Sequence, residues 1–172
     1  DAQGSQFIDY IALLNKKNEE EFDSLNCLTT LNLSGTDMPM SYKGLVNFKH
    51  LRTLDFSNFR WNSYEYPEEK DRHRKLDLSV LHELKDLTKL NLSGNIYDYH
   101  SRFPFRVFDL DGFTNLVSLN LSSTGTTDVT NGGEALKHLK HLDVTDTEIE
   151  LDENAHLLPT ESLITPWIMV GE

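Results

Sequence analysis

The chain has 172 residues, about the length of one domain, and its hydrophobic fraction of 38% is enough to bury a core. A wholly disordered chain is therefore excluded. The formal net charge of −12 argues against duplex DNA or an anionic membrane as the main partner, because both attract an excess of Lys and Arg. Most of this charge lies in residues 109–172, which hold 12 acidic residues and only two lysines.

Cys27 is the single cysteine of the sequence, so no disulfide can form within the chain. This favours a reducing compartment and predicts an intracellular location, in the cytoplasm, the nucleus or both. No run of residues approaches the roughly 18 apolar residues that a membrane-spanning helix needs.

Residues 1–24 are predicted to form an N-terminal capping helix. Phe7, Ile8, Ile11 and Leu14 fall on one face of such a helix. A capping role is expected because the terminal repeats of a stacked array would otherwise expose their leucines.

Residues 25–151 contain five copies of the motif L-x-x-L-x-L-x-x-T. The first copy runs from Leu28 to Thr36, and the first leucines of the later copies are Leu51, Leu87, Leu116 and Leu139, at intervals of 23, 36, 29 and 23 residues. The second and third leucines of each copy alternate along a short strand, so one copy cannot bury its apolar face alone. Stacking the five repeats would build a continuous leucine core and a parallel sheet.

The position after each strand usually holds Asn in this motif, because its amide can bond backbone groups where the chain turns. Asn95 keeps this residue type, whereas Thr36, Thr124 and Thr147 offer a hydroxyl. Phe59 offers no polar group, so we expect an irregular turn in the second repeat.

The segments between the strands carry apolar residues at a spacing of three. This spacing is typical of one helical face, so helices are expected behind the sheet, on its convex side. The residues concerned are Leu45, Phe48 and Leu51; Leu81, Leu84 and Leu87; and Leu136 and Leu139. Residues 152–172 are predicted to form a C-terminal cap, using Leu157, Leu158, Trp167, Ile168 and Val170.

The five motifs resemble those of the leucine-rich-repeat superfamily. The resemblance implies an α/β solenoid, a horseshoe arc with a parallel concave sheet and convex helices. It also implies a protein-binding module without cofactor or catalysis. Leu-Asn-Leu-Ser-Gly-Thr at 31–36 and Leu-Asp-Val-Thr-Asp-Thr at 142–147 resemble the repeats of ZYG-11-type substrate receptors of cullin-RING ubiquitin ligases. That alternative implies elongin and cullin as partners, bound through regions outside this chain.

The side chains of the predicted concave face are mostly short and polar. Its middle column reads Asn32, Asp55, Asn91, Asn120 and Asp143, flanked by Thr30, Thr53, Lys89, Ser118 and His141 on one side and by Ser34, Ser57, Ser93, Ser122 and Thr145 on the other. A solvated face with little affinity and a binding groove both remain open, because short side chains bury little area.

The loops after the second and third strands combine aromatic residues with arginines, the types enriched at interface hot spots. Loops of successive repeats should meet on one edge. We therefore expect a partner-binding site for a protein or peptide. A basic island at Lys70–Lys75 follows the aromatics and favours an acidic one. The candidate residues are Arg60, Trp61, Tyr64, Tyr66, Arg72, Arg74, Lys89, Tyr97, Tyr99, Arg102, Phe103, Phe105 and Arg106. Inward folding of the aromatics, as a small core for long loops, is the alternative.

Enzyme activity is not expected, because no clustered nucleophile, base or metal-ligand set is apparent. The histidines His50, His138 and His141 fall on repeat positions rather than at metal-ligand spacing, and no cofactor is predicted. Binding of single-stranded nucleic acid is a weaker alternative. Basic residues interleaved with Tyr and Trp suggest it, and the acidic character of the rest of the chain opposes it.

Overall fold

The structure is a computed structural model, and it describes residues 27–36, 43–59, 78–95, 107–130, 138–149 and 163–164. The predicted N-terminal cap, residues 1–24, lies outside the described residues. So does the predicted C-terminal cap, residues 152–172, except for two residues.

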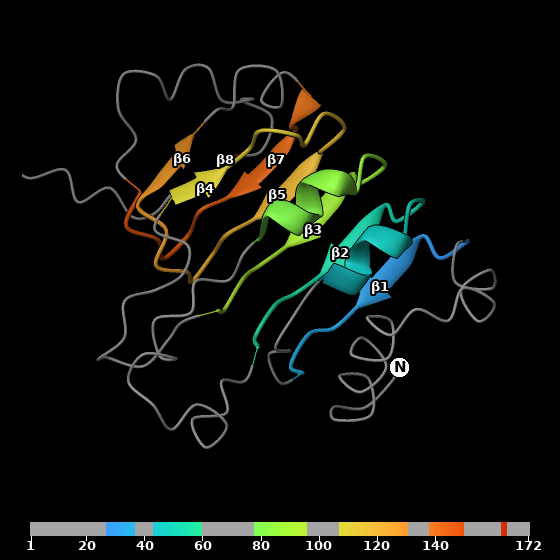
Figure 1. Ribbon diagram of the computed structural model, residues 1–172. Helices are drawn as coiled ribbons and strands as arrows, with labels where there is room; N and C mark the ends of the chain where they lie inside the picture. The colour runs from blue at the N-terminus through green and yellow to red at the C-terminus, as the bar shows by residue number, and fades with distance from the viewer. Residues whose placement is uncertain are drawn as a thin grey trace, which may run out of the picture.

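Six short strands form one parallel sheet, in the order β1-β2-β3-β5-β7-β8 (Figure 1). The first five are β1 (Thr30–Asn32), β2 (Thr53–Asp55), β3 (Lys89–Asn91), β5 (Ser118–Asn120) and β7 (His141–Asp143). Each comes from one predicted repeat, and equivalent residues pair across the sheet: Leu31 with Leu54, then Leu90, Leu119 and Leu142. The predicted parallel sheet is confirmed in these five strands, and their repeats are in register.

The sixth strand, β8 (Leu163–Ile164), falls in the predicted C-terminal cap. It pairs in parallel with β7, with Leu163 beside Leu142 and Ile164 beside Asp143. The sheet thus continues one strand beyond the last recognisable motif.

The described segments behind the sheet differ in part from the predicted helices. The helix predicted around Leu136 and Leu139 lies mostly outside the described residues, and His138, the described residue before Leu139, is α-helical. The first two segments contain short 3-10 helices, η2 (Lys43–Asn47) and η3 (Leu78–Glu83), which lie next to each other (Figure 1). The next two contain strands, β4 (Val107–Asp109) and β6 (Asp128–Thr130), which pair in parallel as a separate two-stranded sheet. A spacing of three matches the 3.0 residues per turn of a 3-10 helix better than the 3.6 of an α-helix, and this explains η2 and η3.

The same i to i+3 geometry carries the spacing of three on toward each strand. Phe48 N donates to Leu45 O at 3.0 Å, and Leu51 N donates to Phe48 O at 2.9 Å. Leu84 and Leu87 repeat this pattern after Leu81, each at 3.0 Å. Each tight turn points its apolar residues to the same side, so all six residues are buried.

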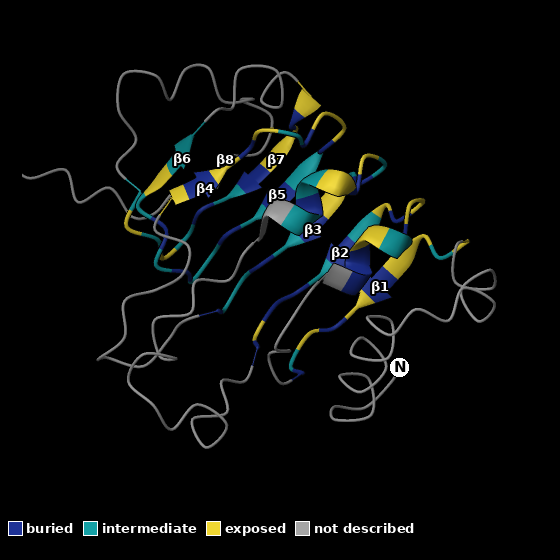
Figure 2. Cartoon of the chain, in the orientation of Figure 1, coloured by how far each residue is buried: buried dark blue, intermediate teal, exposed yellow. Residues whose placement is uncertain are grey.

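One hydrophobic cluster runs through all five repeats, between the large sheet and the layer behind it. It extends from Leu31 in the first repeat to Val144 in the last, and the buried residue of each repeat strand, β1, β2, β3, β5 and β7, is dark blue in Figure 2. Phe108, Leu110 and Phe113 join it from β4 and the turn that follows. Among the described residues, no helix is long and apolar enough to cross a membrane.

Candidate interaction surface

The side chains that alternate with the buried leucines lie on the outer face of the large sheet. In β1, Leu31 is buried between the exposed Thr30 and Asn32. β2, β3, β5 and β7 keep this alternation, with exposed or half-buried residues on either side of the buried leucine. The predicted polar face is therefore accessible at the strand residues on either side of the leucines, whereas Ser57 of its third column is buried, at 4% exposure.

The middle column of this face has a structural role in the turns. The Oδ1 atom of Asn32 accepts a hydrogen bond from Ser34 N at 2.8 Å, closing a turn at the end of β1. The equivalent bond links Asp55 to Ser57, Asn91 to Ser93, Asn120 to Ser122 and Asp143 to Thr145, at 2.8–3.1 Å. Asn and Asp suit this position because their short side chains bond the backbone two residues onward.

These bonds limit what the column can offer a partner. A backbone N–H donates, so the carboxyl or amide oxygen Oδ1 is the accepting atom and is engaged within the turn. The second polar atom of each side chain is Nδ2 in the three asparagines and Oδ2 in Asp55 and Asp143. The column is thus a set of donors and acceptors whose rotamers are already held, which lowers the entropy cost of any contact they make.

The turn after each strand has a recurring backbone conformation. Gly35, Asn58, Gly94, Ser123 and Asp146 occupy equivalent positions, and each has a φ between +50° and +67°. The second repeat keeps this conformation at Asn58 (φ 53°), so its backbone follows the common path.

Hydrogen bonding in the second turn is nevertheless different, as expected from Phe59. Thr36 N donates to Leu33 O at 3.2 Å within its own turn, whereas Phe59 N donates to Asn95 Oδ1 of the next repeat at 2.8 Å. The Phe59 ring is buried and packs against Phe56, with 5.1 Å between ring centroids. The irregularity therefore lies in the hydrogen-bond partner, and the side chain is part of the core.

The turn residues bond the carbonyl three positions earlier, as their chemistry predicts. The hydroxyls of Thr36, Thr124 and Thr147 donate to Leu33 O, Leu121 O and Val144 O at 2.6–2.7 Å. Asn95 Nδ2 donates to Leu92 O at 2.7 Å and also to Phe56 O at 2.8 Å. Asn95 thus serves its own turn and the turn in which Phe59 has no polar group.

Of the thirteen predicted site residues, Lys89 alone falls within the described part of the chain. It is exposed and is the first residue of β3. The loops that carry the other twelve residues begin after Phe59 and Asn95. These positions follow the ends of β2 and β3, whereas Lys89 stands at the start of β3. The residues outside the described ranges are Arg60, Trp61, Tyr64, Tyr66, Arg72, Arg74, Tyr97, Tyr99, Arg102, Phe103, Phe105 and Arg106.

The described residues contain no group of three or more His, Cys, Asp or Glu side chains placed to hold a metal ion. Cys27 is exposed.

Neither a scan against protein-family models nor a search of curated proteins found a match to the chain.

Proposed function

We propose that the chain is a leucine-rich-repeat solenoid that works as an intracellular protein-binding module, an adaptor or a substrate-recognition unit. The observation that supports this most directly is the in-register pairing of β1, β2, β3, β5 and β7, which presents one continuous polar face. A repeated array of this kind provides a broad, preorganised surface suited to another protein.

The proposed partner is a protein segment that contacts this face and the loops after the second and third strands. The loops supply Trp, Tyr, Phe and Arg, which bury large area or form directional hydrogen bonds at interfaces. The sheet supplies fixed polar atoms, which contribute register and specificity rather than buried area.

A pull-down from cell extract tests this proposal. The bait proteins are the wild-type chain, the triple variant Trp61→Ala/Tyr97→Ala/Arg102→Ala, and the control Val46→Ala, which changes an exposed residue of η2. Loss of the recovered partners with the triple variant alone is the expected result, at unchanged thermal unfolding. Equal recovery with all three baits would reject the loop site.

The same experiment addresses the ubiquitin-ligase alternative. A substrate receptor of a cullin-RING ligase would bring down elongin and cullin when the full-length protein is the bait. Recovery of other proteins without them would leave the adaptor function alone.

A further inference from the structure

The first residue of each repeat strand and the residues just before it form a basic surface on this acidic protein. We call this surface the strand-start rim and define it as residues 28–30, 49–53, 85–89, 114–118 and 138–141. Within it lie five of the six Lys and Arg residues of the described chain, and Asp86 is its one acidic residue. The five bases are Lys49, Arg52, Lys85, Lys89 and Lys140, and all are exposed. His50, His138 and His141 are exposed on the same rim.

Backbone hydrogen bonds show that the rim is continuous from one repeat to the next. Thr88 N donates to Arg52 O at 2.9 Å, and Val117 N donates to Thr88 O at 2.8 Å. Lys140 N then donates to Val117 O at 2.8 Å. Bases that lie 33 or more positions apart in the sequence, such as Arg52, Lys85 and Lys140, are therefore brought onto one edge.

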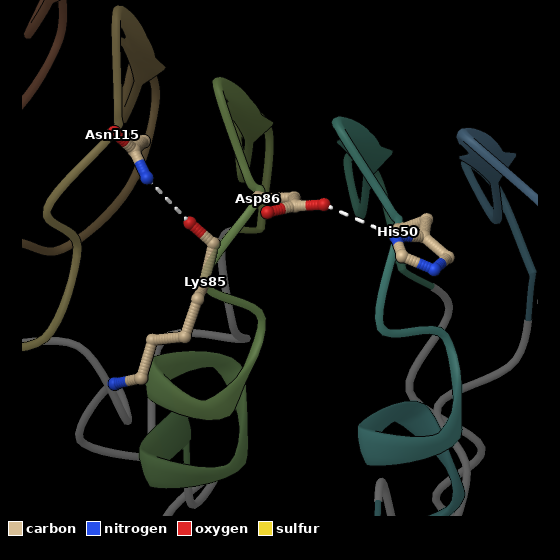
Figure 3. A network of polar contacts seen from close by, with 4 residues as sticks. All are labelled: His50, Lys85, Asp86 and Asn115. Atoms are coloured by element: carbon tan, nitrogen blue, oxygen red, sulfur yellow. Dashed lines mark hydrogen bonds and ion pairs between the residues drawn. The ribbon is translucent and has the colours of Figure 1, made fainter.

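Side chains also connect the rim residues of successive repeats (Figure 3). His50 Nδ1 lies 3.3 Å from Asp86 Oδ2, and Asn115 Nδ2 donates to Lys85 O at 2.8 Å. Five exposed bases outnumber this single carboxylate, so the lysines and Arg52 dominate the charge of the rim. The strand spacing of about 4.8 Å sets the distance between the rim residues of successive repeats.

The rest of the described chain has the opposite sign. The rim carries a formal charge of +4 with histidines neutral, while the other described residues hold eight acidic residues and one base, Lys43. Repulsion by those acids would oppose a long polyanion that extends past the rim. A short acidic segment confined to the rim would meet fewer of them; Glu83 adjoins the rim, since Lys85 N donates to its carbonyl at 3.0 Å.

We propose that the strand-start rim is a docking surface for an acidic protein segment, laid across the repeats so that its carboxylates meet Arg52, Lys89 and Lys140. This inference rests on the proposed protein-binding function and assigns it a second surface, at the opposite ends of the strands from the loops. Single-stranded nucleic acid fits less well, because the protein sites that bind it combine Lys and Arg side chains with exposed aromatic rings. The described rim residues include no Phe, Tyr or Trp.

The test is direct binding at low ionic strength, measured by fluorescence anisotropy. The probe is a labelled peptide of alternating Glu and Ser, and its Gln-Ser counterpart and a thymidine oligonucleotide of equal length serve as comparisons. The rim variant is Arg52→Gln/Lys89→Gln. The control is Val46→Glu/Val107→Glu, which makes the same change in net charge at exposed residues outside the rim and outside the polar face of the sheet.

We expect the wild-type chain to bind the Glu peptide and the rim variant to bind it about tenfold more weakly, with the control within about twofold of wild type. Equal weakening of both variants would show an effect of net charge and overturn the inference. Absence of wild-type binding, or equal affinity for the Gln peptide, would overturn it too. Tighter binding of the oligonucleotide would replace a protein partner with a nucleic acid.

The loop variant Trp61→Ala/Tyr97→Ala/Arg102→Ala separates this inference from the proposed function. It should bind the Glu peptide as wild type does while losing partners in the pull-down. If peptide binding fails but the pull-down behaves as expected, the rim is rejected and the protein-binding module stands.

Discussion

Asn95 connects two repeats through one buried amide. Its side chain is 2% exposed and makes three hydrogen bonds, to Leu92 O in its own turn and to Phe56 O and Phe59 N in the preceding repeat. The threonines at equivalent positions bond the carbonyl of their own turn with one hydroxyl. The residue type predicted a role in the turn, but its reach into the second repeat depends on how the repeats stack.

Asn95→Thr should therefore cost more than a local substitution. Threonine can keep the bond to Leu92 O but cannot reach Phe56 O and Phe59 N, and each lost buried hydrogen bond costs about 1–3 kcal/mol. We expect the free energy of unfolding in urea to fall by about 2–6 kcal/mol. Thr36→Ser, which keeps the hydroxyl, is the control and should change it by less than about 1 kcal/mol. Similar losses for the two variants would contradict this role.

At the level of elements, β4 and its turn form a sixth copy of the strand-and-turn unit. Asp109 Oδ1 accepts from Asp111 N at 2.8 Å, and Gly112 has the positive φ of the other turns, at 84°. Phe113 N donates to Leu110 O at 3.2 Å, as Thr36 N does to Leu33 O in the first repeat. The sequence signal was present in Phe108-Asp-Leu110-Asp-Gly112, with Phe in place of Leu, but this unit pairs with β6 rather than with the large sheet.

Gly112 also marks the junction between β4 and η3. A Cβ atom at this position would lie 2.9 Å from His82 Cβ, and the His82 ring meets Phe113 edge-on with 4.9 Å between centroids. Gly35 has a similar backbone conformation, with φ 65°, but a Cβ there would have no neighbour within 4 Å.

Alanine at these two glycines separates backbone strain from packing. Gly35→Ala should cost about 1–2 kcal/mol, the penalty of a left-handed conformation. Gly112→Ala should cost about 1–3 kcal/mol more, because Cβ of His82 is close to the backbone and cannot rotate away. Urea denaturation of both variants measures the difference, and equal costs would show that η3 does not press against Gly112.

For the whole molecule, the continuous core couples each repeat mainly to its neighbours. Leu90 pairs with Leu54 on one side and Leu119 on the other, whereas Leu31 in β1 pairs with Leu54. The side chains of Leu90 and Leu31 are both buried, at 2% and 4% exposure. In a stacked array, a defect at the centre weakens two interfaces and a defect near the end weakens one.

Hydrogen exchange followed by mass spectrometry can measure this coupling. Leu90→Ala should cost about 2–5 kcal/mol and lower amide protection in β2, β3 and β5 together. Leu31→Ala should lower protection in β1 and β2 while β7 keeps the wild-type rate. Equal loss of protection in every strand with both variants would indicate one indivisible folding unit instead of repeats coupled to their neighbours.

The sequence by itself determined the five strands of the repeats, their buried leucines and the polar residues between them, because alternation along a strand is a local property. Behind the sheet it predicted helices, whereas the described residues form 3-10 helices at η2 and η3, where a spacing of three suits 3-10 turns, and strands at β4 and β6. The helix predicted around Leu136 and Leu139 lies mostly outside the described residues, and His138 there is helical. Only the tertiary structure decided which distant residues meet. Three features join residues of different repeats: the hydrogen bonds of Asn95 to two turns, the close approach of Gly112 to η3, and the strand-start rim. Pairing across a parallel sheet sets such neighbours, and no local sequence pattern encodes them.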